Sequence, residues 1–186
     1  MSEPKFRRYA PEVRAGMLVE AGMACLARGG ITAFTVDNIC REAGASRGLI
    51  THHFGGKDGL LAAVYAAAYA PMLERWEGVG LAGLMDRLFD PAQFAPPGLT
   101  AWLALWGEIA VNPVLQAEHA RHYAAYRTAV AGVLRGHAPD PETLAGALIA
   151  LADGLWLEQC LAPDLMSPDR AKAACRMLLT PILGPF

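Results

Sequence analysis

The run from residue 46 to residue 57 gathers polar side chains that could bind nucleic acid. Arg47 offers a guanidinium, Thr51 a hydroxyl with a methyl group, and His52 an imidazole, and such groups hydrogen-bond to base edges and phosphates. Lys57 stands at the expected start of a helix, where free backbone N–H groups and the helix dipole also favour a phosphate. The alternative for these four residues is a solvated polar face.

Two capping residues and a second histidine extend this set. Thr35 and Ser46 each precede a short helix, and either could donate to a phosphate or act only as a helix cap. His53 is explained equally well by half-buried packing and by DNA contact. The candidate DNA contacts are therefore Thr35, Ser46, Arg47, Thr51, His52, His53 and Lys57.

The spacing of glycine and apolar residues predicts the helices that position these side chains. A first helix is expected over residues 12–28 and ends at Gly29 and Gly30. A short helix over residues 36–43 is closed by Gly44, and a second short helix covers residues 47–54. Two short helices joined by so tight a turn indicate a helix-turn-helix, whose second helix can lie in a major groove. A long helix is expected to follow from Lys57 towards Trp76.

The distribution of proline predicts an all-α protein. No proline lies between Pro11 and Pro71, whereas beyond Pro71 they recur at intervals that alanine and leucine fill. Because proline ends helices or sits in their first turn, these intervals are the natural helix lengths. The expected organisation is a DNA-binding domain over residues 1–56 and a ligand-binding and dimerisation domain over residues 57–186.

Aromatic and polar side chains concentrate beyond Trp76 in a pattern suited to a ligand pocket. Aromatic faces with a few convergent polar groups can line an apolar pocket, and rings beside a carboxylate suit a quaternary ammonium cation. Each ring taken singly is more often part of the core. The candidate ligand residues are Trp102, Trp106, Tyr123, Tyr126 and Trp156, with Phe89 and Phe94 nearby in sequence and Glu108, Asn112, His119, His122, Asp153 and Glu158 as polar groups.

The last two expected helices carry more apolar residues than one buried face needs. Apolar positions cover most of the circumference over residues 142–160, and the final helix, over residues 169–179, continues the pattern. Packing this pair against a two-fold copy would form a four-helix dimer interface, with Leu148 taken as an outward position. The alternative is a monomeric bundle.

Charge places any polyanion-binding surface in the first part of the chain. The 186 residues carry a net charge of -2, yet Lys and Arg outnumber Asp and Glu by nine to seven up to Trp76, and the balance reverses beyond it. Lys5, Arg7 and Arg8 form a basic arm that could reach the DNA backbone or a minor groove. A disordered tail explains the arm equally well.

The cysteines indicate the cellular compartment, and one pair of histidines could bind a metal. The four cysteines form no CxxC pair, which favours reduced thiols over a zinc or disulfide framework, and no targeting segment is visible, so a cytoplasmic protein without cofactor is expected. His119 and His122 lie beside Glu118 at a spacing that could bind a metal. A helical metal-binding enzyme or a ligand-free interaction module therefore remains the alternative to a regulator.

The stretch FTVDNICREAGASRGLITHHFGGKDGLL resembles the DNA-binding region of the TetR family of transcriptional repressors. The resemblance covers about residues 12–64, and the run from Ser46 to Phe54 is similar to the recognition run of BetI-type repressors, which respond to choline. Residues 102–113 and 147–161 also resemble the C-terminal half of that group. One departure is Thr51, which stands where many members have a tyrosine that contacts DNA.

This resemblance implies a dimeric repressor that binds an inverted-repeat operator in double-stranded DNA. A small-molecule effector would release it, with choline or another quaternary ammonium as the first candidate. A different apolar amine or aromatic ligand is the alternative effector.

Overall fold

The chain folds into helices throughout its described parts. The computed structural model describes residues 10–74, 76–91 and 96–186, and within these ranges it contains nine α-helices and no strand. The all-α prediction is confirmed. The helices are α1 (Pro11–Ala33), α2 (Val36–Ala43), α3 (Arg47–Phe54), α4 (Lys57–Leu73), α5 (Leu81–Leu88), α6 (Pro96–Ile109), α7 (Pro113–Leu134), α8 (Pro141–Leu161) and α9 (Pro168–Leu183).

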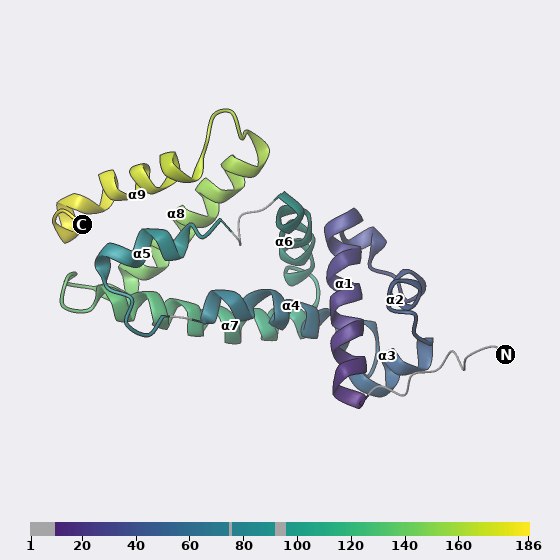
Figure 1. Cartoon of the computed structure of the whole chain (residues 1–186). Helices are drawn as coiled ribbons and strands as arrows, with labels where there is room; N and C mark the ends of the chain where they lie inside the picture. Colours follow the sequence, from purple (N-terminus) through teal and green to yellow (C-terminus); the bar gives the residue numbers. More distant parts are fainter. Residues whose placement is uncertain (1–9, 75, 92–95) are drawn as a thin grey trace.

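Helices α1 to α3 form an N-terminal head at one end of the molecule (Figure 1). The turn between α2 and α3 begins at Gly44, whose φ of 59° is a left-handed conformation that glycine adopts at little cost. Thr35 caps α2, because its side-chain oxygen accepts a hydrogen bond from the backbone N–H of Asn38 at 3.2 Å. Ser46 occupies the corresponding position before α3 but makes no capping hydrogen bond through its side chain.

Two helix boundaries differ from the sequence prediction. Gly29 and Gly30 interrupt α1 as expected, with Gly30 at a φ of 62°, but one more helical turn follows them and α1 ends at Ala33. That turn delivers Phe34 to the core, where it is fully buried. Helix α4 ends at Leu73 rather than near Trp76, soon after Pro71, which cannot donate a hydrogen bond to the preceding turn.

The remaining helices form a body in which α4 and α6 connect to the head. Helix α4 leaves the head and packs along α7, while α6 packs against α1 (Figure 1). The core is continuous from head to body, since Leu18 of α1, Tyr65 of α4 and Leu105 of α6 are all fully buried in one cluster. Helices α8 and α9 lie at the end of the body away from the head.

The outward face of α8 and α9 is not the predicted one. Leu148 is buried within the protomer, with only 1% of its surface exposed, so its assignment as an outward residue was wrong. Apolar residues cover so much of α8 that sequence periodicity could not separate the inner face from the outer one. The large apolar side chains exposed on these two helices are Leu161 at the end of α8 and Met177, Leu178 and Ile182 on α9.

Helix α8 is also long and apolar enough to cross a membrane by length and composition alone. Its apolar window has a mean hydropathy of 1.4, and the bent pair of α6 and α7 passes the same test when its two helices are taken together. The core helix of a globular protein passes this test too. Helix α8 packs against both α7 and α9, and it contributes Ala145, Leu148 and Ile149 to the core.

Candidate functional site

Helix α3 separates apolar from polar residues between two faces. Ile50 is buried, and Leu49 and Phe54 pack half-buried against the core. Arg47 and Thr51 are exposed, as is His52. This division leaves an exposed polar surface on the head, which is accessible to a groove of double-stranded DNA.

Arg47 is held by a neighbour on the preceding helix. Its guanidinium forms an ion pair with the carboxylate of Asp37, in the first turn of α2, and both side chains are largely exposed. Exposed ion pairs contribute only about 0–1 kcal/mol. Arg47 can therefore exchange Asp37 for a phosphate or a base edge at small cost.

The other candidate DNA contacts surround this surface. Thr35, Ser46 and Lys57 are exposed, whereas His53 is half-buried and its ring lies edge-on to that of His52, with 4.9 Å between the centroids. Lys57 begins α4. The arm of Lys5, Arg7 and Arg8 lies outside the described residues.

A cavity of about 390 Å³ lies between helices of the body and α1 of the head. Four of the five candidate ligand residues line it, namely Trp102, Trp106, Tyr126 and Trp156. Tyr123 is not among the lining residues, and its ring stacks on His119 instead, at 5.1 Å and 22°. Of the aromatic residues noted beside them, Phe89 is fully buried in the core, and Phe94 lies outside the described residues.

Aromatic rings enclose much of this cavity. Trp102 packs edge-on against Tyr69 at 5.3 Å between centroids, and Trp106 packs edge-on against Trp156 at 5.7 Å. Trp102 also contacts Trp106, with 6.1 Å between their centroids. Rings fixed by one another keep their faces and edges in place, which allows them to shape a binding site without collapsing into it.

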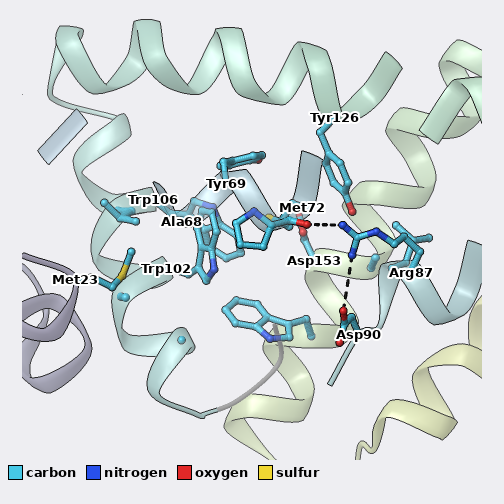
Figure 2. A pocket seen from close by; sticks show the side chains of 17 residues that line it. Met23, Ala68, Tyr69, Met72, Arg87, Asp90, Trp102, Trp106, Tyr126 and Asp153 are labelled. Carbon is cyan, nitrogen blue, oxygen red and sulfur yellow. Dashed lines mark hydrogen bonds and ion pairs between the residues drawn. The ribbon is translucent and has the colours of Figure 1, made fainter. Parts of the chain in front are cut away.

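Asp153, on α8, brings a carboxylate to this cavity. Among the described residues it has no hydrogen-bond or ion-pair partner, and it lies between Met72 and Arg87 in Figure 2. Burial raises the pKa of Asp153 from 3.8 to about 6, because the apolar surroundings disfavour the charged form. Asp153 also raises the pKa of the Tyr126 hydroxyl, after the larger effect of burial. With a pKa of about 6, the Asp153 carboxylate is mostly ionised at neutral pH.

Arg87, on α5, joins the cavity to the end of α4. Its guanidinium donates to the backbone oxygen of Pro71, and Asp90 lies 3.8 Å from its other terminal nitrogen (Figure 2). The guanidinium also donates to the backbone oxygen of Glu74 at 2.7 Å. It also lies 5.4 Å from the ring centre of Trp76. A cation at a helix C-terminus satisfies the last carbonyl groups and complements the helix dipole.

The polar residues named from the sequence have different positions. Asp153 lines the cavity, but Glu108, Asn112 and Glu158 do not. His119 Nδ1 lies 2.7 Å from the hydroxyl of Tyr65, and His122 stacks on Tyr69. Burial lowers the pKa of both histidines. Tyr65 contacts the rings of both histidines, at 6.0 and 6.1 Å between centroids, and the described residues contain no cluster suited to a metal ion.

Sequence reasoning missed several lining residues. Met23 on α1, Tyr69 and Met72 on α4, and the Arg87–Asp90 pair all border the cavity. Met23 and Tyr69 sit in helices that read as ordinary core helices. No sequence signal distinguishes a residue facing a cavity from one facing a neighbour.

Two family models match this chain, one in its N-terminal part and one in its C-terminal part. The family model described as "Bacterial regulatory proteins, tetR family" matches residues 18–64, and the one described as "BetI-type transcriptional repressor, C-terminal" matches residues 80–184. The HTH-type transcriptional regulator BetI 2 of Chromohalobacter salexigens is 31% identical over 94% of this chain and 90% of its own length.

Solved structures give the same result. A transcriptional regulator of Pseudomonas aeruginosa PAO1 is 36% identical, with a TM-score of 0.83 over 95% of this chain and 93% of that one. A regulator of Saccharomonospora viridis, solved in complex with choline, shares the fold with a TM-score of 0.73 at 22% identity, over 91% of this chain and 96% of that one.

These matches favour the regulator over the metal enzyme and the ligand-free module, and they belong to a class of proteins that is not enzymatic. The chain therefore belongs to the TetR family of bacterial transcriptional regulators, and its C-terminal part is that of the BetI-type repressors.

Proposed function

We propose that this regulator is a cytoplasmic homodimeric repressor that binds an inverted-repeat operator through α3 and releases it when a small organic cation enters the cavity. The observation that carries the proposal is Asp153, a carboxylate without a described partner among aromatic rings. TetR-family regulators bind DNA and ligands and are typically dimers, which supports each part. Residues 1–56 would read the DNA, and residues 57–186 would sense the ligand and dimerise.

DNA recognition is assigned to the exposed side of the head. Arg47 and His52 suit base edges, while Lys57 and Thr35 suit phosphates. Thr51 adds a methyl group that can contact thymine. One helix of eight residues specifies too few bases alone, so a two-fold dimer would read two half-sites about 34–36 Å apart.

The effector is assigned to the cavity as a quaternary ammonium. A cation beside Asp153 would neutralise a buried charge, and aromatic faces stabilise such cations by about 0.5–2 kcal/mol. The choline bound in the Saccharomonospora viridis neighbour supports this class of ligand. Choline is therefore the first compound to test.

The signal would reach the head along two routes. Helix α6, which carries Trp102 and Trp106, packs directly on α1. Helix α4 begins at Lys57 beside the head and ends where Arg87 binds its last carbonyl groups. A cation near Asp153 and Asp90 repels Arg87, which weakens its hold on α4. Both routes would change the separation of the two α3 helices in the dimer.

Dimerisation is assigned to α8 and α9. Met177 is 71% exposed and Leu178 54% exposed on α9, and only 28% of the apolar window of α8 is buried within the protomer. Exposed small residues at helical spacing, Ala147, Ala150 and Gly154, would let α8 approach its copy closely. Two such pairs form a four-helix interface.

The operator contacts can be tested with three alanine variants. Footprinting upstream of the gene should find a protected inverted repeat. Arg47→Ala and His52→Ala should each lose about 1–3 kcal/mol of discrimination between operator and scrambled duplex. Lys57→Ala should weaken binding to both duplexes and lower the salt slope by about 1. Arg170→Ala, on the distant helix α9, is the control, and equal wild-type binding to both duplexes would refute the proposed function.

The dimer interface can be tested by adding charge to α9. The double variant Met177→Glu and Leu178→Glu should sediment as a monomer at micromolar concentration and lose operator affinity, because two carboxylates would be buried against their copies. Val111→Glu is the matched control, since Val111 is an equally exposed apolar residue between α6 and α7. A monomeric wild-type protein would contradict the assignment.

The cost of the buried carboxylate can be measured without ligand. The pKa of Asp153 is raised to about 6 in the folded protein, so the wild type loses stability as pH rises from about 4 to about 6. Asp153→Asn should therefore match the wild type near pH 4 and exceed it by about 1–3 kcal/mol at pH 7 in urea unfolding.

The aspartate that caps α8 provides the control for this experiment. Asp140→Ala should instead lose stability at pH 7, because Asp140 caps α8 through the N–H of Thr143 at 3.1 Å. Lower stability of Asp153→Asn at pH 7 would mean that the Asp153 carboxylate serves the fold rather than a ligand.

The role of Arg87 can be tested through the effector response. Arg87→Met should shrink the ratio of operator Kd values with and without choline by about tenfold or more, while choline binding itself persists, since α4 would already be released. Arg87→Lys should keep part of the response. Arg135→Met is the control, because Arg135 pairs with Glu142 away from the cavity. A full response in Arg87→Met would exclude this route.

A further inference from the structure

The two ends of the cavity differ in chemistry. Arg87 and Asp90 lie at one end, with Asp153 close by, whereas Met23 and Trp106 lie at the opposite end (Figure 2). Leu105 and Ala101, both buried on α6, add apolar surface to the lining. A ligand that complements this cavity needs a charged part and an apolar part in fixed order.

The size of the cavity also exceeds what choline fills. Its volume of about 390 Å³ lies within the range of roughly 300–1,000 Å³ typical of sites for drug-sized molecules. At roughly 20–30 Å³ for each non-hydrogen atom at the packing density of a protein interior, there is room for about 13–20 such atoms. Choline has only about half of the lower number, so it would leave the apolar end unfilled.

We infer that the effector is an ammonium ion carrying an apolar substituent of several carbon atoms. Its cationic group would lie beside Asp153, and its apolar tail would extend to Met23. This inference rests on the proposed function, because it names the ligand class of the same cavity. The charge and the apolar lining together select an amphiphilic cation over both a small polar cation and a neutral hydrocarbon.

The position of Met23 gives the tail a role in signalling. Met23 belongs to α1, which also packs on α2 in the head and on α4 of the body. A ligand tail long enough to contact Met23 touches the N-terminal head of the protein directly. A short cation would act only through the cavity walls in the body. Release of the operator should therefore become more effective as the tail grows.

A series of alkyltrimethylammonium ions tests this inference on the unmodified protein. Affinity is measured by calorimetry for tetramethylammonium, choline, and the propyl, butyl and hexyl compounds, all below their micelle-forming concentrations. Each methylene that enters the apolar end should tighten binding by about fourfold, with one ligand bound per protomer. The increase should level off once the tail fills the cavity.

Two methionine variants and one aspartate variant separate the contribution of the ligand's cationic group to affinity from that of its apolar tail. Met23→Ala should weaken the hexyl compound about fivefold or more and leave choline unchanged. Met17→Ala is the matched control, because Met17 lies on the same helix but outside the cavity lining. Asp153→Asn should weaken every cation by a similar factor and preserve the increment for each methylene.

The outcomes distinguish this inference from the function on which it rests. A flat series, in which choline binds as tightly as the hexyl compound, would overturn the amphiphilic ligand while leaving a cationic effector in place. Equal losses for choline and the hexyl compound in Met23→Ala would overturn the position of the tail. Failure of every ammonium ion to bind at millimolar concentration would refute the cationic effector itself.

Discussion

Helix α1 packs on α2 and α4 on its DNA side and on α6 at the cavity, so one helix belongs to both the head and the sensor. The packing is tight at Gly22, where an added Cβ would lie 2.8 Å from a methyl group of Val64 on α4 and 3.0 Å from the ring of Phe34. Interfaces this tight do not deform gradually. The head and the middle of α4 are therefore tightly packed together, and in the proposed function a displacement of the cavity wall on α6 would be transmitted to α1.

The second constraint is electrostatic. A carboxylate at Asp153 in apolar surroundings is unfavourable for folding, which its raised pKa of about 6 expresses. Most sites at which a protein accepts such a cost are sites of function, because an apolar residue would pack there more stably. In the proposed function, a cation in the cavity would convert this cost into binding free energy.

The third constraint is the way α4 is tied along its length. Asn112, which caps α7, donates to Asp58 in the first turn of α4 at 3.3 Å. Tyr65 and His119 connect the middle of α4 to α7, and Arg87 binds the far end. Of these three attachments, Arg87 is the one that also borders the cavity. In the proposed function, a ligand there would loosen the far end of α4 while the other two attachments act as a pivot.

Much of the head was determined by local sequence. The glycine at position 44, the cap at Thr35 and the apolar spacing of α2 and α3 act within a few residues of one another, so the helix-turn-helix and its exposed polar face could be predicted without tertiary information. The expectation of aromatic residues around a pocket with Asp153 also came from composition, and four of the five chosen rings line the cavity.

Tertiary structure alone decided which apolar residues face inward. Leu148 is buried, Tyr123 leaves the cavity for His119, and Met23 reaches the cavity from the head. In helices that are apolar around most of their circumference, as α8 is, periodicity carries little information about orientation, and the neighbouring helices decide it by packing. The cap that Arg87 provides for α4 joins residues 13 and 16 positions apart, and such contacts form only after the chain between them has folded.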